Sequence, residues 1–276
     1  MQAALVAELP ITKYNDASIT DAMDQLAVEE PLELHLEHGP STNPSKQSVS
    51  VTMRTPGADA ELSAGFLFTE GILSDRADIL KIGEGALGEN TILVSLIEGA
   101  VPVLGKADRN FYTTSSCGVC GKASIEAIKT VSPYPQQADS ISIPAGLFPG
   151  LPDLLRQQQA VFNSTGGLHA SALFSLDGRF LALREDVGRH NALDKLIGAA
   201  FLAGNLPLHE AILLLSGRAS FELVQKAAMA GLRIIAAVGA PSSLAVQLAD
   251  EQGITLIGFL RGERFNIYTH PRRIAV

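Results

Sequence analysis

The sequence predicts an α/β protein whose C-terminal third forms a parallel sheet. Apolar runs with the composition of buried strands alternate there with helical segments: AILLL, FELVQKAAMAG, RIIAAV, LAVQLADEQG and ITLIGFL. Strands that alternate with helices of about ten residues are typical of right-handed βαβ crossovers. The chain has 276 residues, of which 46% are hydrophobic, so it is long enough to bury a sizeable core.

The first hundred residues predict a β-rich module. Three strand-like runs, LELHLEHG, QSVSVTMRT and NTILVSLIEG, are separated by turn residues, and ADAELSAGFLFTEGIL between them has helical spacing of its apolar residues. The segment from Thr130 to Leu151 contains four prolines and is expected to be an irregular connector. We therefore divide the chain into a β-rich N-terminal module with an inserted helix, residues 1–108, and an α/β core, residues 109–276.

A basic rim is predicted at the carboxyl edge of the parallel sheet. The segments SGRAS, GAPSS and RGERF each follow one of the three strands, so they emerge together at the edge where open α/β sheets bind ligands. They carry Arg218, Arg261 and Arg264 on a chain whose net charge is −8. The sequence therefore predicts a local anion site on an acidic protein.

Composition excludes several classes of function. The acidic net charge argues against broad capture of DNA or RNA, and an aromatic content of 5% without tryptophan argues against a base-stacking platform. No apolar run approaches the length of a membrane span, and the N-terminus does not have the features of a secretory signal. We expect a cytoplasmic protein with no membrane or nucleic-acid partner.

The two cysteines of the chain, Cys117 and Cys120, stand in the sequence CGVCG. Lys122 begins a predicted helix directly after them, and the positive end of a helix favours thiolate over thiol. Gly118 and Gly121 allow the loop to bend and to approach a bulky partner closely. The pattern therefore indicates reactive sulfur.

Several interpretations of this pair remain open from the residues alone. The cysteines are a buried apolar pair, part of a metal site, a thioredoxin-like dithiol, or a sulfur carrier that holds a persulfide. A structural zinc requires four ligands, and a single Cys-x-x-Cys supplies two. His35 and Glu37 resemble half of the zinc deaminase signature, but Ser116 occupies the position of its proline, so no zinc is expected.

Blocks along nearly the whole chain resemble the formate dehydrogenase accessory sulfurtransferases, the FdhD family. They occur in the order of that family: MRTPGADAELSAGFLFTEGI, RNFYTTSSCGVCGKASIE, STGGLHASALF, REDVGRHNALDKLIG, SGRASFELVQKAAMAG, GAPSSLAVQLA and GFLRGERFNIYTH. So many ordered blocks favour the sulfur carrier among the interpretations above.

The resemblance implies a function and a fold. Members of the family receive sulfur from a cysteine desulfurase and pass it to the molybdenum cofactor with two guanine dinucleotide arms, which formate dehydrogenase requires. They are cytoplasmic homodimers with a cytidine deaminase-like α/β core that lacks the catalytic zinc. Likeness to the deaminase fold does not transfer deaminase activity. The alternatives are a thiol-disulfide oxidoreductase that uses the same pair and a non-catalytic chaperone that delivers the cofactor.

The resemblance also implies site residues. Cys117 would carry the persulfide, and Cys120 would assist or protect it. The implied cofactor-binding stretch consists of Phe259, Leu260, Arg261, Gly262, Glu263 and Arg264.

Further candidates come from the residues themselves. Arg218 in SGRAS is a candidate for phosphate binding. His190, with Arg189 and Asn191, begins a predicted helix for which Asp186 is the expected cap. The alternative for these groups is a structural role in capping and salt links. His169 follows a glycine turn at Gly166–Gly167, and both a ligand contact and a structural role remain open for it.

Overall fold

The computed structural model describes residues 4–84, 88–104, 132–134 and 140–276. Cys117, Cys120 and the helix expected after them lie outside the described residues. The described chain forms several sheets and six α-helices, and the predicted α/β class is confirmed.

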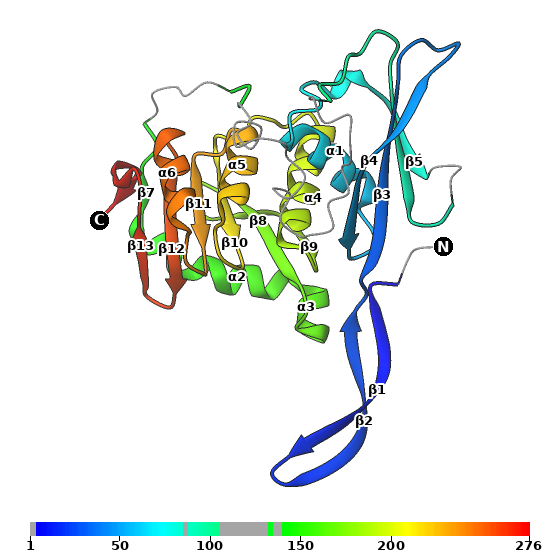
Figure 1. Ribbon diagram of the computed structural model, residues 1–276. Coiled ribbons are helices and arrows are strands. Elements are labelled where there is room, and N and C mark those ends of the chain that lie inside the picture. The colour runs from blue at the N-terminus through cyan, green and yellow to red at the C-terminus, as the bar shows by residue number, and fades with distance from the viewer. Residues whose placement is uncertain (1–3, 85–87, 105–131, 135–139) are drawn as a thin grey trace.

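A six-stranded sheet forms the centre of the larger part of the molecule (Figure 1). Its three predicted strands are β10 (Ala211–Leu215), β11 (Ile234–Ala237) and β12 (Thr255–Arg261), and they are parallel, as predicted. Three antiparallel pairings complete the order β13-β12-β11-β10-β8-β9, with β8 (His169–Ser175), β9 (Phe180–Asp186) and β13 (Arg264–Ile267). Because β8 is antiparallel to both of its neighbours, β9 points the same way as β10.

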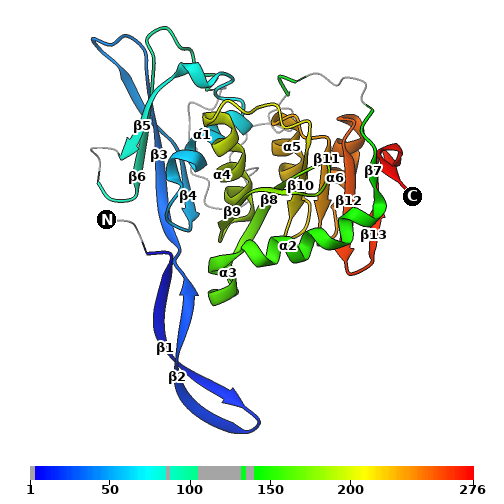
Figure 2. The ribbon, with the colours of Figure 1, turned by 180° about the vertical axis from the view of Figure 1, so that it is seen from behind.

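Helices cover both faces of this sheet. Every residue of β10 and β11 is buried, and strands that are apolar on both sides need a layer on each face. One layer consists of α4 (Arg189–Leu202), α5 (Phe221–Met229) and α6 (Ser243–Glu251), and the other of η3 (Ala145–Gly150), α2 (Leu151–Gln158) and α3 (Ala160–Thr165), as Figures 1 and 2 show. The two layers enclose separate apolar clusters on the two faces of the sheet.

A four-stranded sheet forms most of the N-terminal part. Its order is β4-β3-β6-β5, with β3 (Glu30–His38), β4 (Ser45–Arg54), β5 (Ile79–Glu84), after the short helix η1 (Arg76–Asp78), and β6 (Thr91–Leu96). Alternate residues Leu32, Leu34 and Leu36 of β3 are buried, so this sheet has one apolar face. The predicted helix α1 (Asp59–Thr69) packs on that face.

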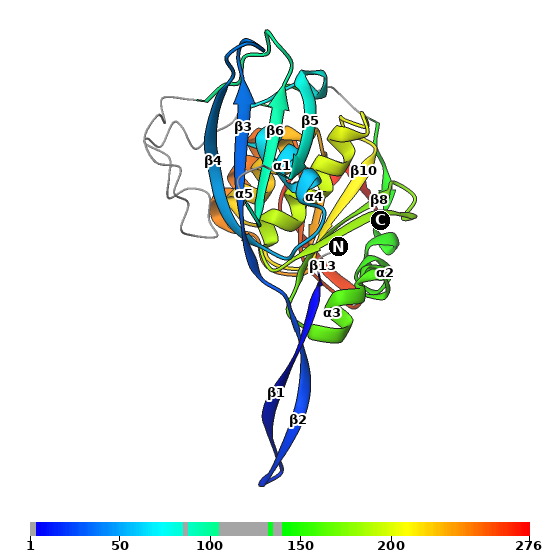
Figure 3. The ribbon, with the colours of Figure 1, turned by 90° about the vertical axis from the view of Figure 1, so that its right-hand side faces the viewer.

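Helices α1 and α4 lie between the two sheets and touch backbone to backbone (Figure 3). A Cβ atom on Gly65 would lie 1.9 Å from the carbonyl oxygen of Asp194, and one on Gly198 would lie 1.8 Å from that of Glu61. Glycine is therefore required at both positions. Phe68 of α1 packs in the core of the larger sheet, whereas Leu67 packs under the smaller sheet.

A two-stranded ribbon projects from the body, and the sequence patterns did not predict it (Figures 1 and 3). It consists of β1 (Val6–Asn15) and β2 (Ser18–Ala27), which pair along their full length. Its contact with the rest of the chain is near its base, where β2 approaches α3.

Two further short strands lie near the C-terminus. Strand β7 (Ile143–Pro144) pairs with β14 (Ile274–Ala275), which follows the short helix η4 (Pro271–Arg273). The described part of the chain contains no helix with the length and apolar character needed to cross a bilayer.

Candidate functional site

Three loops are joined at the carboxyl edge of the large sheet, as the sequence predicted. The amide of Gly239 donates to the carbonyl oxygen of Gly217 (2.9 Å), and the amide of Phe259 donates to that of Gly239 (3.0 Å). A further bond links Ser242 to Ala219. Backbone bonds between neighbouring loops fix their relative positions, so the edge forms one continuous surface.

Arg218 lies exposed on this surface. A Cβ atom on Gly239 would lie 2.9 Å from Cγ of Arg218. The GAPSS loop therefore passes directly against the SGRAS loop only because residue 239 is glycine. The contact places the base of the Arg218 side chain between the loops. Within the described residues, no ion pair involves this guanidinium.

The implied cofactor-binding stretch forms the end of β12 and its turn into β13. Arg261 and Arg264 face each other across the strand pair, and both are exposed. Gly262 has φ 55° in the turn, and Glu263 is exposed beside it. Two guanidiniums directly opposite each other repel, so a nearby anion would stabilise this turn.

Phe259 and Leu260 have opposite environments. Phe259 has φ 54°, in the left-handed region that bulky residues rarely occupy, and its side chain is 42% exposed. Leu260 is fully buried in the apolar cluster under the sheet. Leu260 therefore contributes to the site through its backbone and its packing, whereas the ring of Phe259 is available to a ligand.

A cavity of about 590 Å³ opens beside these loops. It lies between the α2–α3 layer and the carboxyl edge, and its volume lies in the range of small-ligand sites. Its wall includes Phe162, whose ring centroid lies 4.2 Å from the guanidinium carbon of Arg156. Its lining also includes Asp153, Gln159, Gly166, Gly167, His169, Ser216, Gly217 and Val238.

His169 is the first residue of β8 and lies in the wall of this cavity. Burial lowers its pKa, and the positive charges of Arg189 and His190 lower it further. The imidazole is therefore neutral at pH 7 and can both donate and accept a hydrogen bond. The structure places this predicted candidate beside the loops.

His190 lies at the start of α4 and is 9% exposed. Its Nε2 lies 2.8 Å from Oε2 of Glu222, the second residue of α5. Burial is the largest single influence on the pKa of Glu222 and raises it, but the hydrogen bond to His190 and the charges of His190 and Lys226 together outweigh burial, so the net shift of the pKa is downward. His190 therefore links α4 to α5 through Glu222. It also lies near the His169 imidazole.

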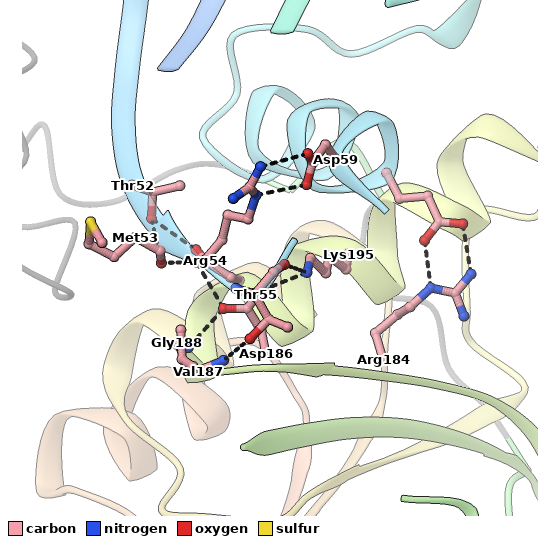
Figure 4. A network of polar contacts seen from close by, with 12 residues as sticks. Thr52, Met53, Arg54, Thr55, Asp59, Arg184, Asp186, Val187, Gly188 and Lys195 are labelled. Carbon is pink, nitrogen blue, oxygen red and sulfur yellow. Dashed lines mark hydrogen bonds and ion pairs between the residues drawn. The ribbon is translucent and has the colours of Figure 1, made fainter. Parts of the chain in front are cut away.

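Asp186 does not cap α4, so that prediction was wrong. The helix begins after Gly188 without a side-chain cap, and Asp186 is fully buried, with Oδ2 2.7 Å from Nζ of Lys195 (Figure 4). The same carboxylate accepts from the amide of Thr55 and from the side chain of Asn191. A buried carboxylate needs such partners, and here they come from α4 and from Thr55, the residue after β4.

Asn191 belongs to the same network. Its Nδ2 donates to the carbonyl oxygen of Met53 (2.8 Å), and its Oδ1 accepts from the hydroxyl of Thr52 (3.3 Å). Asn191 thus holds strand β4 against α4 and does not face the loops.

The described ends of the cysteine-bearing segment lie at the opposite edge of the sheet. The amide of Val103, near the point where the described chain stops, donates to the carbonyl oxygen of Ile72. After the gap, the hydroxyl of Ser132 donates to Ala228 near the C-terminus of α5. Tyr134 lines a second cavity, of about 330 Å³, at this amino edge.

Sequence patterns missed the α2–α3 wall of the carboxyl-edge cavity. Leu151 and Leu155, one turn apart and buried, together with Pro152 in the first turn, are the signal from which α2 was predictable. Nothing in the sequence indicated that Phe162 would stack with Arg156, because that contact joins two short helices whose orientation the packing determines.

The arrangement favours a ligand that is both anionic and planar. Exposed arginines and the N-termini of α5 and α6 provide positive potential at the carboxyl edge. The neighbouring cavity provides an aromatic wall and polar groups.

The chain is similar to known proteins along most of its length. The model of the FdhD/NarQ family matches residues 27–275. Over 261 residues the chain is 51% identical to the sulfur carrier protein FdhD of Mycobacterium tuberculosis, covering 91% of this chain and 92% of that one. It is 40% identical over 269 residues to the protein of the same name from Sulfolobus acidocaldarius, covering 98% of each.

A solved structure has the same fold. It belongs to a protein assigned as a formate dehydrogenase accessory protein from Desulfotalea psychrophila, with a TM-score of 0.75 and 25% identity. The match covers 99% of this chain and 100% of the other. Taken with the family model and the relatives above 40% identity, this shows that the chain belongs to the FdhD/NarQ family.

Proposed function

We propose that the chain is a sulfur carrier that accepts sulfur from a cysteine desulfurase and transfers it to the molybdenum cofactor of formate dehydrogenase. The family membership carries this proposal, because relatives at 51% identity bear the name sulfur carrier protein FdhD. The two cysteines of the sequence are the residues whose chemistry can hold such a sulfur.

Cys117 accepts the sulfur in this proposal. Its thiolate attacks the outer sulfur of a persulfide on the desulfurase, a new S–S bond forms on Cys117, and the donor cysteine leaves as a thiolate. Cys120 assists this step or protects the persulfide. The persulfide intermediate makes the protein a sulfurtransferase.

The carboxyl edge binds the cofactor, which is the substrate that receives the sulfur. Each of its two arms combines a pyrophosphate with a guanine. Arg218, Arg261 and Arg264 are suited to the phosphates because guanidinium groups form paired bonds to phosphate oxygens. The cavity lined by Phe162 and His169 is suited to the planar guanine.

The protein acts in the cytoplasm as a homodimer. Its core is related to the cytidine deaminases in fold, without a catalytic zinc. Its partners are the desulfurase, formate dehydrogenase and the guanine dinucleotide form of the cofactor.

Replacing Cys117 tests the sulfur step. The Cys117→Ala variant should gain no sulfur after incubation with a desulfurase and cysteine, whereas the natural protein should gain one sulfur atom on the peptide that contains Cys117. Mass spectrometry of the intact protein and of its peptides measures both. The same variant should leave formate dehydrogenase inactive in a host that depends on this protein.

The alternative functions give different results in the same experiment. A chaperone that delivers the cofactor would keep formate dehydrogenase active in Cys117→Ala, and that outcome contradicts the proposal. A thiol-disulfide oxidoreductase would form a Cys117–Cys120 disulfide and gain no sulfur. Cys120→Ala is the matched control, since loading of Cys117 should persist in it.

A further inference from the structure

Within the described part of the chain, no other element covers the projecting ribbon formed by β1 and β2 along most of its length (Figure 1). Each strand has ten residues, and the contact with α3 lies near the base. A two-stranded ribbon alone is marginally stable in water. The family model begins at residue 27, the last residue of β2.

Both faces of the ribbon carry exposed apolar side chains. The register pairs Leu9 with Asp24 and Tyr14 with Ile19, which places these two pairs on opposite faces. Tyr14 and Ile19 are 75% and 71% exposed, and Leu9 is 48% exposed. Exposed apolar groups along a projecting ribbon indicate a surface that a partner covers.

One face has a charge pattern that is complementary to itself. This leucine face consists of Ala7, Leu9, Ile11, Lys13, Thr20, Ala22, Asp24 and Leu26. Lys13 lies two residues toward the tip from Ile11, and Asp24 lies two residues toward the base from Ala22, the partner of Ile11. A twofold axis at the Ile11–Ala22 pair, with the ribbons antiparallel, brings Lys13 of each copy to the level of Asp24 of the other.

The same two side chains cannot pair within one ribbon. They are four residue levels apart in the register, about 13 Å along the strands. Neither belongs to an ion pair within the part of the chain that the structure describes. The complementarity is therefore satisfied only between two copies.

We infer that the ribbon is an arm that binds the equivalent arm of a second copy through the leucine face, with Lys13 and Asp24 pairing between copies. This rests on the homodimer in the proposed function, and not on its sulfur chemistry. A second copy fits better than an unrelated protein because a ribbon this exposed needs a permanent partner.

Charge reversal tests the arm in the full-length protein. Lys13→Glu and Asp24→Lys each place like charges together twice in the dimer, so each should raise its dissociation constant by about tenfold or more. The double variant Lys13→Glu/Asp24→Lys restores both pairs and should regain the natural dissociation constant, as should an equimolar mixture of the two single variants. Sedimentation velocity over a dilution series measures all four samples.

Glu98→Lys is the matched control for Asp24→Lys, because it reverses an acidic side chain in the same way at an exposed turn away from the ribbon. It should dissociate like the natural protein. The inference is wrong if the single reversals have the same dissociation constant as this control. It is also wrong if the double variant dimerises no better than either single variant, or if the natural protein is monomeric. Sulfur loading of Cys117 is measured separately, so failure of the arm and failure of the sulfur carrier are distinguishable.

Discussion

At the scale of single residues, the cross-strand pair of Arg261 and Arg264 is the feature on which the proposed cofactor site most directly depends. Like charges directly opposite in a strand pair are unfavourable, and Glu263 between them lies on the exposed turn. A phosphate between the two guanidinium groups would offset their repulsion, and both groups would then contribute to the affinity for the ligand.

Replacing both arginines should weaken binding of guanosine diphosphate. The Arg261→Ala/Arg264→Ala variant should lose about 3 kcal/mol, roughly a hundredfold in affinity, because hydrogen bonds to charged groups are worth about 1.5 to 3 kcal/mol each. Isothermal titration calorimetry measures the affinity. Arg179→Ala, an exposed arginine on the turn before β9, is the control, and equal affinities for all three proteins would remove the pair from the site.

At the scale of elements, the contact between α1 and α4 depends on two glycines. A methyl group at residue 198 would overlap the carbonyl oxygen of Glu61, which belongs to the backbone of α1 and cannot rotate away. The helices would have to move apart, and both sheets would move with them.

Gly198→Ala should therefore destabilise the protein by about 3 kcal/mol, the upper end of overpacking costs. In an ordinary helix interior the same change raises the free energy of unfolding by up to about 1 kcal/mol. Gly198→Ala should therefore have the opposite effect on stability. Urea unfolding followed by circular dichroism measures the effect. Gly146→Ala, where a Cβ meets no atom within 4 Å, should cost little, and a stabilised Gly198→Ala would contradict the close contact.

Elements with a clear local pattern were predictable from the sequence, whereas those defined by packing were not. Strands β10 and β11 consist of apolar residues and β12 is largely apolar, so all three could be recognised as buried strands. The helices between them predicted that the three strands are parallel. The ribbon lacks such a pattern, because both of its faces mix apolar and charged residues. Asp186 was misassigned for a related reason, since its partners Lys195 and Thr55 approach only in the folded chain.

At the scale of the whole molecule, buried ionic contacts join the N-terminal part to the core. Nζ of Lys195 donates to the carbonyl oxygen of Thr55 (2.7 Å) as well as pairing with Asp186. Nearby, Lys226 of α5 pairs with Asp194 of α4 and with Glu70 at the end of α1. Burial alone would lower the pKa of Lys226, but these two carboxylates outweigh it and raise the pKa.

Lys195→Met should lower the free energy of unfolding of the whole chain by about 3 to 5 kcal/mol, because Asp186 would remain as a buried charge without its cation. Amide hydrogen exchange should show strands β3 and β10 losing protection together, since the contact spans both parts. The exposed Lys81→Met is the control and should change stability by less than about 0.5 kcal/mol. Loss of protection in β3 alone would show that the two parts unfold separately.

The backbone of Phe259 has a consequence for thermal stability. Its φ of 54° is a conformation that glycine adopts freely and that costs other residues about 1 to 3 kcal/mol. Glycine at this position would relieve that penalty, but it would also remove an aromatic ring that is 42% exposed. The protein is therefore less heat-resistant than a glycine variant would be, and in exchange it presents this ring to the solvent.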